Sequence, residues 1–313
     1  MSVDRRDRYH GALLGLAAGD ALGTTLEFTR KGDVEPIDDM IGGGPFSLPP
    51  GYWTDDTSMA LCLAESLVER NEFDPHDQMT RYVRWWREGH WSSTGTCFDI
   101  GNTTRAALSR FEQDDDPFAG SSDPNAAGNG SLMRLAPVAL RYAHDPAMAV
   151  RYAAESSRTT HAAREAIDAC RYFAALIVGA LKGHDKSELL SPRFAPDGVD
   201  WSADPLSPPI DAIAAGSFEH KTEREIRASG YVVHTLEAAL WALARTSSFR
   251  DGALLAVNLG EDADTTGAVY GQLAGAYYGA HAIPESWRNK VVKREEIERL
   301  ASALLERAVA EAS

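Results

Sequence analysis

Apolar residues recur at helical spacing along most of the chain, and no stretch shows the strict apolar–polar alternation of a half-buried strand. The longest apolar run lies within residues 164–181 and predicts a central helix. The pattern therefore predicts an all-α fold without a sheet. The expected helices span residues 9–22, 58–69, 103–111, 131–142, 147–157, 164–181, 232–245, 248–258, 265–280 and 295–312.

Three long segments rich in Gly, Pro, Asp or Ser separate these helices, at residues 31–51, 113–130 and 190–209. Loops of this length are uncommon inside a compact domain and often line binding sites. The last loop has the composition of a domain linker, but candidate chemical residues lie on both sides of it. We therefore expect one domain over residues 1–313. The charged amphipathic segment at 295–311 is expected to cover the bundle rather than to bind a partner.

The formal net charge of −15 argues against non-specific binding to nucleic acid or to anionic membranes, because an acidic surface repels phosphate. The three cysteines are far apart in the sequence and form no C-x-x-C motif, which argues against a disulfide scaffold and a thiolate zinc site. No apolar run is long enough to span a bilayer. We expect a cytoplasmic enzyme without membrane insertion and without a nucleic-acid partner.

Two short clusters combine carboxylates with hydroxyls where a loop meets a helix. They are Trp53-Thr54-Asp55-Asp56-Thr57 and Gly260-Glu261-Asp262-Ala263-Asp264-Thr265-Thr266. One Asp or Thr is enough to cap a helix, for about 0.5–2 kcal/mol of stability. Several carboxylates packed together repel one another unless a cation offsets their charge. The pair of clusters therefore favours a metal site over simple capping, provided that the two helix starts converge.

Such a site offers only oxygen ligands, which suit Mg²⁺ or Mn²⁺ rather than zinc or copper. The carboxylates of Asp55, Asp56, Asp262 and Asp264 are enough for two divalent cations. Two ions can polarise a substrate oxygen and orient or ionise a water molecule.

Weaker signals lie elsewhere. Glu27 follows the small-residue end of the first helix and Asp99 lies near Gly101; taken singly, each is more often a structural hydrogen-bonding group. The segment Gly128-Asn129-Gly130-Ser131 fits an anion cradle or an ordinary turn with an N-cap. His161 fits a ligand contact and a helix cap equally well. A nucleophile elbow, a P-loop and a dinucleotide fingerprint are all missing from the sequence.

In their order along residues 10–282, these motifs resemble the ADP-ribosylglycohydrolase family. The resemblance rests on residues 11–15 and 19–23 (GALLG and GDALG), 53–59 (WTDDTSM), 128–134 (GNGSLMR), His161, and 262–268 (DADTTGA). Within the family it is greatest to the dinitrogenase reductase-activating glycohydrolases, through residues 97–105 (CFDIGNTTR), 229–235 (SGYVVHT) and 270–275 (YGQLAG). Glu261 departs from the family pattern, since many relatives carry Gly there.

The resemblance implies a single-domain, all-α orthogonal bundle that binds two divalent cations, Mn²⁺ or Mg²⁺. The residues that match family metal ligands are Thr54, Asp55, Asp56, Asp262, Asp264 and Thr265. The positions that match the ADP-ribose cleft are Asn102, Gly130, Ser131, Met133, His161 and Tyr231. Asp99 and Glu27 match the catalytic carboxylates. Asp99 would stabilise oxocarbenium-like charge or handle a proton, Glu27 would orient the sugar and tune the metals, and these two roles are interchangeable at this stage. Tyr231 would stack beside the adenosine or hold the arginine.

The implied reaction removes ADP-ribose from an arginine side chain of a modified protein, with dinitrogenase reductase as the target and a PII-type signalling protein as a regulatory partner. One alternative is a related hydrolase that acts on serine-linked ADP-ribose, O-acetyl-ADP-ribose or a toxin-modified protein, because no motif identifies the acceptor side of the cleft. The other is a non-enzymatic ADP-ribose-binding protein, against which the six occupied ligand positions argue.

Overall fold

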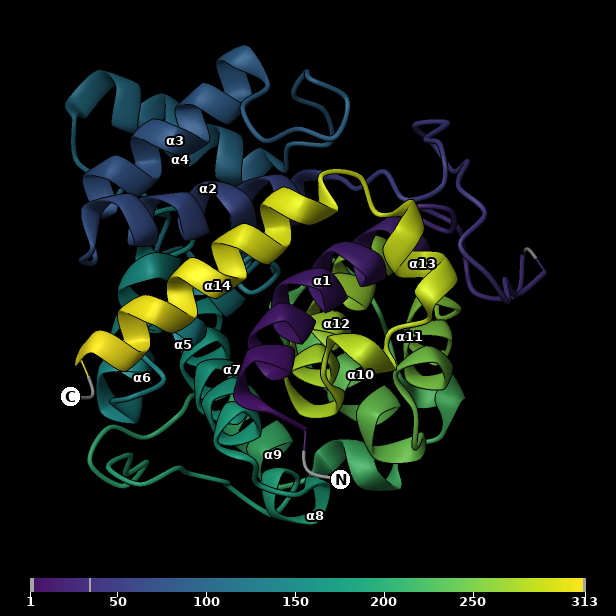
Figure 1. Ribbon diagram of the computed structural model, residues 1–313. Helices are drawn as coiled ribbons and strands as arrows, with labels where there is room; N and C mark the ends of the chain where they lie inside the picture. Colours follow the sequence, from purple (N-terminus) through teal and green to yellow (C-terminus); the bar gives the residue numbers. More distant parts are fainter. Residues whose placement is uncertain (1–2, 34, 312–313) are drawn as a thin grey trace.

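The computed structural model describes residues 3–33 and 35–311 as a bundle of helices joined by turns and loops (Figure 1). The described residues contain no strand, only three isolated β-bridges. The prediction of an all-α fold is therefore confirmed. The α-helices are α1 (Arg5–Gly23), α2 (Asp55–Arg70), α3 (Pro75–Glu88), α4 (Asn102–Asp114), α5 (Ala136–Arg141), α6 (Pro146–Arg158), α7 (Arg164–Lys182), α8 (Lys186–Leu189), α9 (Pro208–Ala214), α10 (Val232–Arg245), α11 (Phe249–Val257), α12 (Ala263–Tyr278), α13 (Glu285–Lys290) and α14 (Arg294–Glu311).

Helices α1 and α12 run antiparallel and touch backbone to backbone. A Cβ atom added to Gly15 would lie 2.2 Å from the carbonyl oxygen of Gly271, and one added to Gly19 would lie 2.0 Å from that of Gly267. Each glycine costs a helix about 1 kcal/mol relative to alanine, so glycines at every fourth position need a packing reason. Their close contact brings the C-terminal end of α1 beside the N-terminal end of α12.

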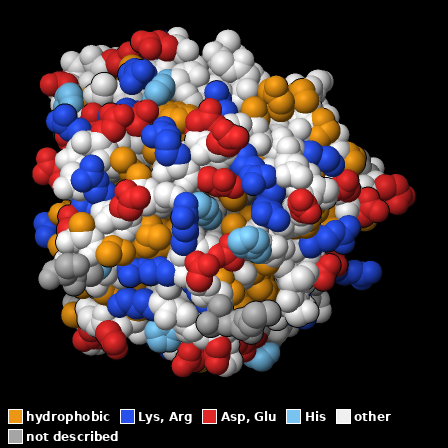
Figure 2. Space-filling view, in the orientation of Figure 1, with side chains coloured by type: hydrophobic (Ala, Val, Ile, Leu, Met, Phe, Trp, Pro, Cys, Tyr) orange, Lys and Arg blue, Asp and Glu red, His pale blue; other side chains and the backbone are white. Residues whose placement is uncertain are grey.

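Helix α7 is buried over most of its length, as its apolar sequence predicts. Helix α14 lies beside α1 in Figure 1 and also packs against α2 and α5. Its buried face consists of Ile297, Leu300, Ala301, Leu304 and Ala308, so this helix covers the bundle as expected. The expected last residue of this helix, Ala312, lies outside the described residues. Acidic side chains are distributed among Lys and Arg over the face drawn in Figure 2.

Three details differ from the expected helices. α2 and α12 begin at Asp55 and Ala263, so both acidic clusters enter the first helical turn instead of preceding it. The helix expected over residues 131–142 is shorter, because α5 begins only at Ala136, beside Pro137. Proline lacks the N–H that a helix interior needs and is tolerated in the first turn. The preceding residues instead form a turn in which the Asn129 carbonyl accepts two backbone hydrogen bonds.

The short helices α8, α9 and α13 have no counterpart among the expected helices, and neither does the longer helix α3. Asp74 caps its start by accepting a hydrogen bond from the amide of Asp77 at 3.0 Å, and Gly89 ends it with φ of 72°. Its buried residues Met79, Tyr82 and Trp85 follow a three-residue spacing, which the charged residues between them obscure. No helix in the described part of the chain is long and apolar enough to cross a membrane.

Candidate functional site

Asp20, in the last turn of α1, holds the start of α2 through four hydrogen bonds. One of its oxygens accepts from the amide and the hydroxyl of Thr54, both at 2.9 Å. The other accepts from the amide and the hydroxyl of Thr57 at 3.0 and 2.6 Å. The motifs did not assign a role to Asp20. The sequence offers one indication of its importance, a carboxylate inside a helix of small and apolar residues. In the structure the Asp20 side chain is fully buried.

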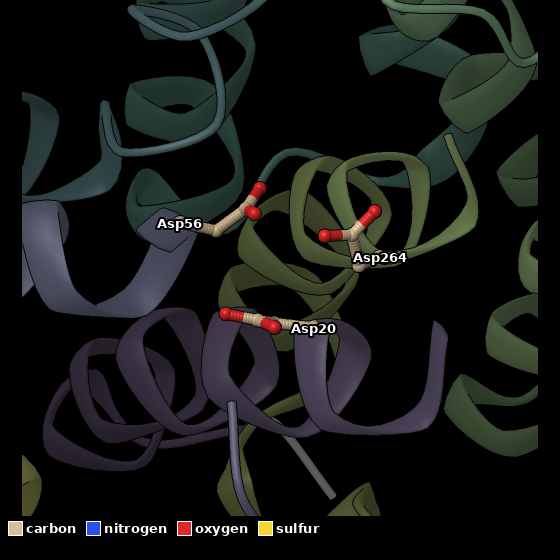
Figure 3. A group of neighbouring side chains, drawn as sticks. All are labelled: Asp20, Asp56 and Asp264. Atoms are coloured by element: carbon tan, nitrogen blue, oxygen red, sulfur yellow. The ribbon is translucent and has the colours of Figure 1, made fainter. Parts of the chain in front are cut away.

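The two acidic clusters meet in space. The Thr54 hydroxyl lies 3.1 Å from Oδ2 of Asp264, although 210 positions separate these residues. Carboxylate oxygens of Asp20, Asp56 and Asp264 all lie within 4.8 Å of one another. Figure 3 shows these three side chains around a common space, each from a different helix. The convergence on which a shared cation site depends is therefore present.

Capping does not explain the hydroxyl and carboxylate at the two helix starts. Thr54 and Asp262 occupy the N-cap positions of α2 and α12, yet neither side chain accepts a capping hydrogen bond. The Thr54 hydroxyl faces the carboxylates instead. Oδ2 of Asp262 accepts a hydrogen bond from the Asn129 side chain at 2.7 Å. The Thr54 side chain is thus directed toward the carboxylates, and that of Asp262 toward Asn129, rather than toward their own helices.

The site contains more negative oxygens than its own donors can satisfy. The Thr54 hydroxyl lies 2.9–3.1 Å from three carboxylates, those of Asp20, Asp56 and Asp264. A hydroxyl has one proton to donate, so the Thr54 hydroxyl can donate a hydrogen bond to only one of these three carboxylates at a time. Oδ1 of Asp56 and Oδ1 of Asp264 are buried without any hydrogen-bond partner. An unpaired buried charge is costly, and a divalent cation would remove that cost. The donor set therefore fits an oxygen-coordinated cation.

Burial and mutual repulsion raise the pKa of the carboxyls. Burial raises the pKa of Asp20 to about 6 against the opposing effect of its hydrogen bonds. Burial, followed by the charge of Asp99, raises the pKa of Glu27 to about 10, and burial with neighbouring carboxylates raises that of Asp99 to about 7. The same causes, burial first, raise the pKa well above the ordinary range for Asp55, Asp56 and Asp264.

A second group of carboxylates opens to a cavity of about 700 Å³. Oxygens of Glu27, Asp99 and Asp264 lie within 4.8 Å of one another, and all three residues line the cavity. Oε2 of Glu27 is buried without a hydrogen-bond partner. Asp99 has a left-handed backbone with φ of 59°, an uncommon conformation for a residue other than glycine. Asp264 belongs to both groups and therefore joins the buried acidic site to the cavity.

The cavity brings together most of the residues that the sequence singled out. Those that line it are Glu27, Asp55, Asp99, Asn102, Gly130, Met133, His161, Asp262, Asp264 and Thr265. Thr54 and Asp56 do not line it and are fully buried. Among the described residues, no Lys or Arg lines the cavity. An anion bound there would therefore depend on backbone N–H groups, hydroxyls, amides and metal ions.

Gly130 packs directly against His161. A Cβ atom at Gly130 would lie 2.7 Å from Cε1 of the imidazole, so a larger residue would displace the ring. Burial lowers the pKa of His161 to about 3, which keeps the ring neutral, and Nδ1 lies 2.9 Å from the hydroxyl of Thr160. The glycine turn and the neutral imidazole thus form one rigid wall of the cavity.

Two predicted residues lie elsewhere. The Ser131 hydroxyl is buried and lies 2.8 Å from that of Ser157, so its side chain is engaged away from the cavity. Tyr231 lines a neighbouring pocket, where its hydroxyl donates to Glu165 at 2.6 Å. This pocket shares Gly128 and Gly230 with the main cavity. The two spaces are therefore contiguous along the glycine turn.

The described chain combines an all-helical architecture with an acidic, oxygen-lined cavity. A family model described as ADP-ribosylglycohydrolase matches residues 1–313. A solved structure described as "ADP-ribosylglycohydrolase-related protein complex" shares 48% identity with a TM-score of 0.85, over 97% of this chain and 99% of that one.

Curated relatives agree with this match. The chain is 47% identical over 302 residues to "ADP-ribosylarginine hydrolase Tri1" of Pseudomonas putida, covering 96% of this chain and 79% of the relative. It is 34% identical over 306 residues to "ADP-ribosyl-[dinitrogen reductase] glycohydrolase" of Rhodospirillum rubrum, covering 96% of each. The chain belongs to the ADP-ribosylglycohydrolase family.

Proposed function

We propose that this protein is a metal-dependent hydrolase that releases ADP-ribose from an arginine side chain of a modified protein. The observation that carries the proposal is the position of Asp264, which belongs to the buried acidic group and also faces the cavity with Glu27 and Asp99. A cation site and a pair of catalytic carboxylates would then act on the same bound sugar. The arginine linkage is supported by relatives of that name at 47% and 43% identity.

The predicted ligand set for two Mn²⁺ or Mg²⁺ ions is Thr54, Asp55, Asp56, Asp262, Asp264 and Thr265. Asp20 joins it either as a ligand or as the group that orients Thr54. When bound, the ions would neutralise the carboxylates, polarise sugar hydroxyls and lower the pKa of a water molecule. The unpartnered oxygens of Asp56 and Asp264 support this assignment.

The protein's own residues would bind and orient the substrate. The pyrophosphate would be held by the backbone N–H groups of Gly130 and Ser131 and by those at the start of α4, where Asn102 lies, since no Lys or Arg of the described chain lines the cavity. His161 and Met133 would shape this wall, and Tyr231 would contact the adenosine in the neighbouring pocket. Glu27 would orient the ribose through its hydroxyls.

In the reaction, a water oxygen bonds to ribose C1″ while the bond from C1″ to the guanidinium nitrogen breaks. The bonding electron pair leaves with the nitrogen, and positive charge builds on the sugar as in other glycoside hydrolysis. Asp99 would stabilise this charge and accept the proton of the attacking water. That proton finally passes to the departing guanidine, which restores the arginine cation.

Dinitrogenase reductase is the proposed target, and the relative of 34% identity that is named for this substrate favours it. A PII-type regulatory partner and action in the cytoplasm complete the proposal. The free thiols of Cys62, Cys97 and Cys170 suit a reducing compartment. The two relatives at 47% and 43% identity have names that specify the arginine linkage but no target protein. Other proteins modified on arginine are therefore the competing targets.

The test is release of ADP-ribose from dinitrogenase reductase and from an unrelated protein, both modified on arginine, and from a serine-linked peptide and O-acetyl-ADP-ribose. Each reaction is run with Mn²⁺, with Mg²⁺ and with a chelator. We expect metal-dependent release from arginine, lowered by at least about 100-fold in Asp99→Asn. Release from the serine linkage alone would contradict the linkage. Binding of ADP-ribose without release from any substrate would identify a binding protein instead.

A further inference from the structure

A large aromatic side chain stands exposed at the edge of the cavity. Phe28 directly follows Glu27, lines the cavity and is 69% exposed, the highest value among the exposed large hydrophobic residues of the described chain. Its backbone is left-handed with φ of 60°, which is rare and unfavourable for a bulky residue. The fold therefore holds an apolar ring in the solvent next to Glu27, a carboxylate that lines the cavity.

The backbone of Glu261 is fixed beside that of Phe28 by a reciprocal contact. The Phe28 amide donates to the Glu261 carbonyl at 2.7 Å, and the Glu261 amide donates to the Thr29 carbonyl at 2.7 Å. Glu261 also has a left-handed backbone, with φ of 56°, and also lines the cavity. The two residues come from opposite ends of the sequence, so this contact is a built feature of the cavity edge and not a local turn.

The aromatic edge continues over two further loops. Phe46 lies edge-on to Phe28 with ring centroids 6.4 Å apart, and it lies 5.2 Å from Phe98, the neighbour of Asp99. The rings thus connect the segments that carry Glu27 and Asp99. Phe28, the one of these rings that lines the cavity, is therefore backed by two further aromatic side chains.

The position of this edge shows which part of a substrate would meet it. The glycine turn and His161 form the wall proposed for the pyrophosphate, and that wall leads toward Tyr231 and Glu165. Phe28 and Glu261 instead adjoin the carboxylates at the reaction centre. A group leaving from C1″ would exit past them, whereas the adenosine would lie at the other end.

A ring face next to a carboxylate suits a guanidinium ion. Guanidinium is planar and weakly hydrated, so it stacks on aromatic faces while its N–H groups pair with carboxylates. Glu261 already attracts one guanidinium, since Arg227 lies 3.6 Å from it with its side chain 60% exposed. Such an exposed ion pair contributes little and can be exchanged at low cost.

We propose that Phe28 and Glu261 form an acceptor subsite that holds the guanidinium of the modified arginine and selects it over neutral, hydroxyl-linked ADP-ribose. This subsite rests on the proposed function, because it presupposes an arginine-linked substrate. Phe28 supplies the ring face and Glu261 the counter-charge. Both are specificity-determining residues and take no part in bond breaking.

The test compares Phe28→Leu, which keeps apolar bulk but removes the ring, and Glu261→Gln, which keeps size but removes the charge. KM and kcat are measured on an arginine-modified protein and on O-acetyl-ADP-ribose, with bound metal quantified for each variant. We expect KM for the arginine-linked substrate to rise about 3- to 30-fold, with kcat, metal content and the neutral substrate unchanged. Thr29→Ser, which keeps the backbone contact, is the matched control and should behave as wild type.

Each contrary outcome has a distinct meaning. Equal losses on both substrates would mean that Phe28 contacts the ADP-ribose itself, and this would overturn the subsite. Unchanged KM in both variants, in a protein that still prefers the arginine linkage, would overturn it as well. A wild-type protein that cleaves only the neutral substrate would refute the proposed function, a result that is visible before any variant is made.

Discussion

A Cβ atom on Gly19 would lie 2.0 Å from the carbonyl oxygen of Gly267, so nothing larger than a hydrogen atom fits between α1 and α12 at this point. Gly19 directly precedes Asp20, and Gly267 lies one helical turn after Asp264. The backbone contact therefore sets the distance between two carboxylates of the buried acidic group. The close packing of glycines between α1 and α12 therefore also determines the geometry of the acidic group.

Replacement of Gly19 by alanine should destabilise the protein and disturb the acidic group together. The added carbon meets the backbone of α12, which cannot rotate away, so we expect a loss of at least about 2 kcal/mol in unfolding free energy. Urea denaturation measures it. Gly101→Ala is the control, because a Cβ there meets nothing within 4 Å, and it should cost less than about 1 kcal/mol. Equal effects of the two substitutions would contradict the role given to the contact.

Divalent cations should stabilise the folded protein against heat. A ligand at 100 times its Kd stabilises the state that binds it by about 2.7 kcal/mol, so Mn²⁺ or Mg²⁺ should raise Tm by several degrees. Asp56→Asn should abolish most of this shift, since Asp56 has a buried oxygen without a partner. Glu306→Gln, at an exposed position on α14, should retain it. A wild-type Tm that does not respond to either metal would argue against a cation site.

The metal-free protein should lose stability as the pH rises. Its buried carboxyls bind protons more tightly when folded, with the pKa of Asp20 raised to about 6 and that of Asp99 to about 7. Folding is then favoured at low pH and weakened as the pH passes from the unfolded values near 4 through the folded ones. Thermal denaturation between pH 5 and 8 with a chelator should show Tm falling with pH. Saturating metal should flatten the curve, and a metal-free Tm that rises over this range would refute the expectation.

Removal of the Thr57 hydroxyl should weaken both folding and cation binding. That hydroxyl donates to a buried carboxylate, Asp20, at 2.6 Å. Hydrogen bonds to charged groups contribute about 1.5–3 kcal/mol, so Thr57→Val should cost about that much and loosen the start of α2. Thr246→Val loses a hydrogen bond to a neutral carbonyl and is the matched control. Calorimetric metal titration should show weaker binding in Thr57→Val alone; unaltered affinity would mean that Asp20 does not organise the site.

Variants of Tyr231 should separate its ring from its hydroxyl. Stacking of a base on an aromatic ring is worth about 1–3 kcal/mol, so Tyr231→Ala should raise KM about 10-fold or more. Tyr231→Phe keeps the ring and loses only the hydrogen bond to Glu165, so its KM should stay within about threefold of wild type. If Tyr231→Phe and Glu165→Gln raised KM as much as Tyr231→Ala does, binding would depend on the hydrogen bond between the hydroxyl and the carboxylate. Stacking on the ring would then contribute little.

The helices that the sequence predicts well are those whose apolar residues dominate. Residues 164–181 form α7 almost as expected because a buried helix needs few polar residues. α3 was not expected, since its charged exposed face outweighs the apolar stripe of Met79, Tyr82 and Trp85. The turn after Asn129 and Leu135 replace five expected helical residues, 131–135, because Pro137 restricts where α5 can begin.

The spacing of apolar residues and the order of the motifs along the sequence determined the all-helical class, the two oxygen-rich clusters and the family. Only the tertiary structure decided that Asp20 joins those clusters, that Ser131 turns to Ser157, and that Phe28 stands beside Glu261 at the cavity edge. The physical reason is the separation along the chain of the residues that interact. A helical period or a motif is encoded by neighbours in the chain, whereas the surroundings of a single side chain depend on which distant backbone packs against it.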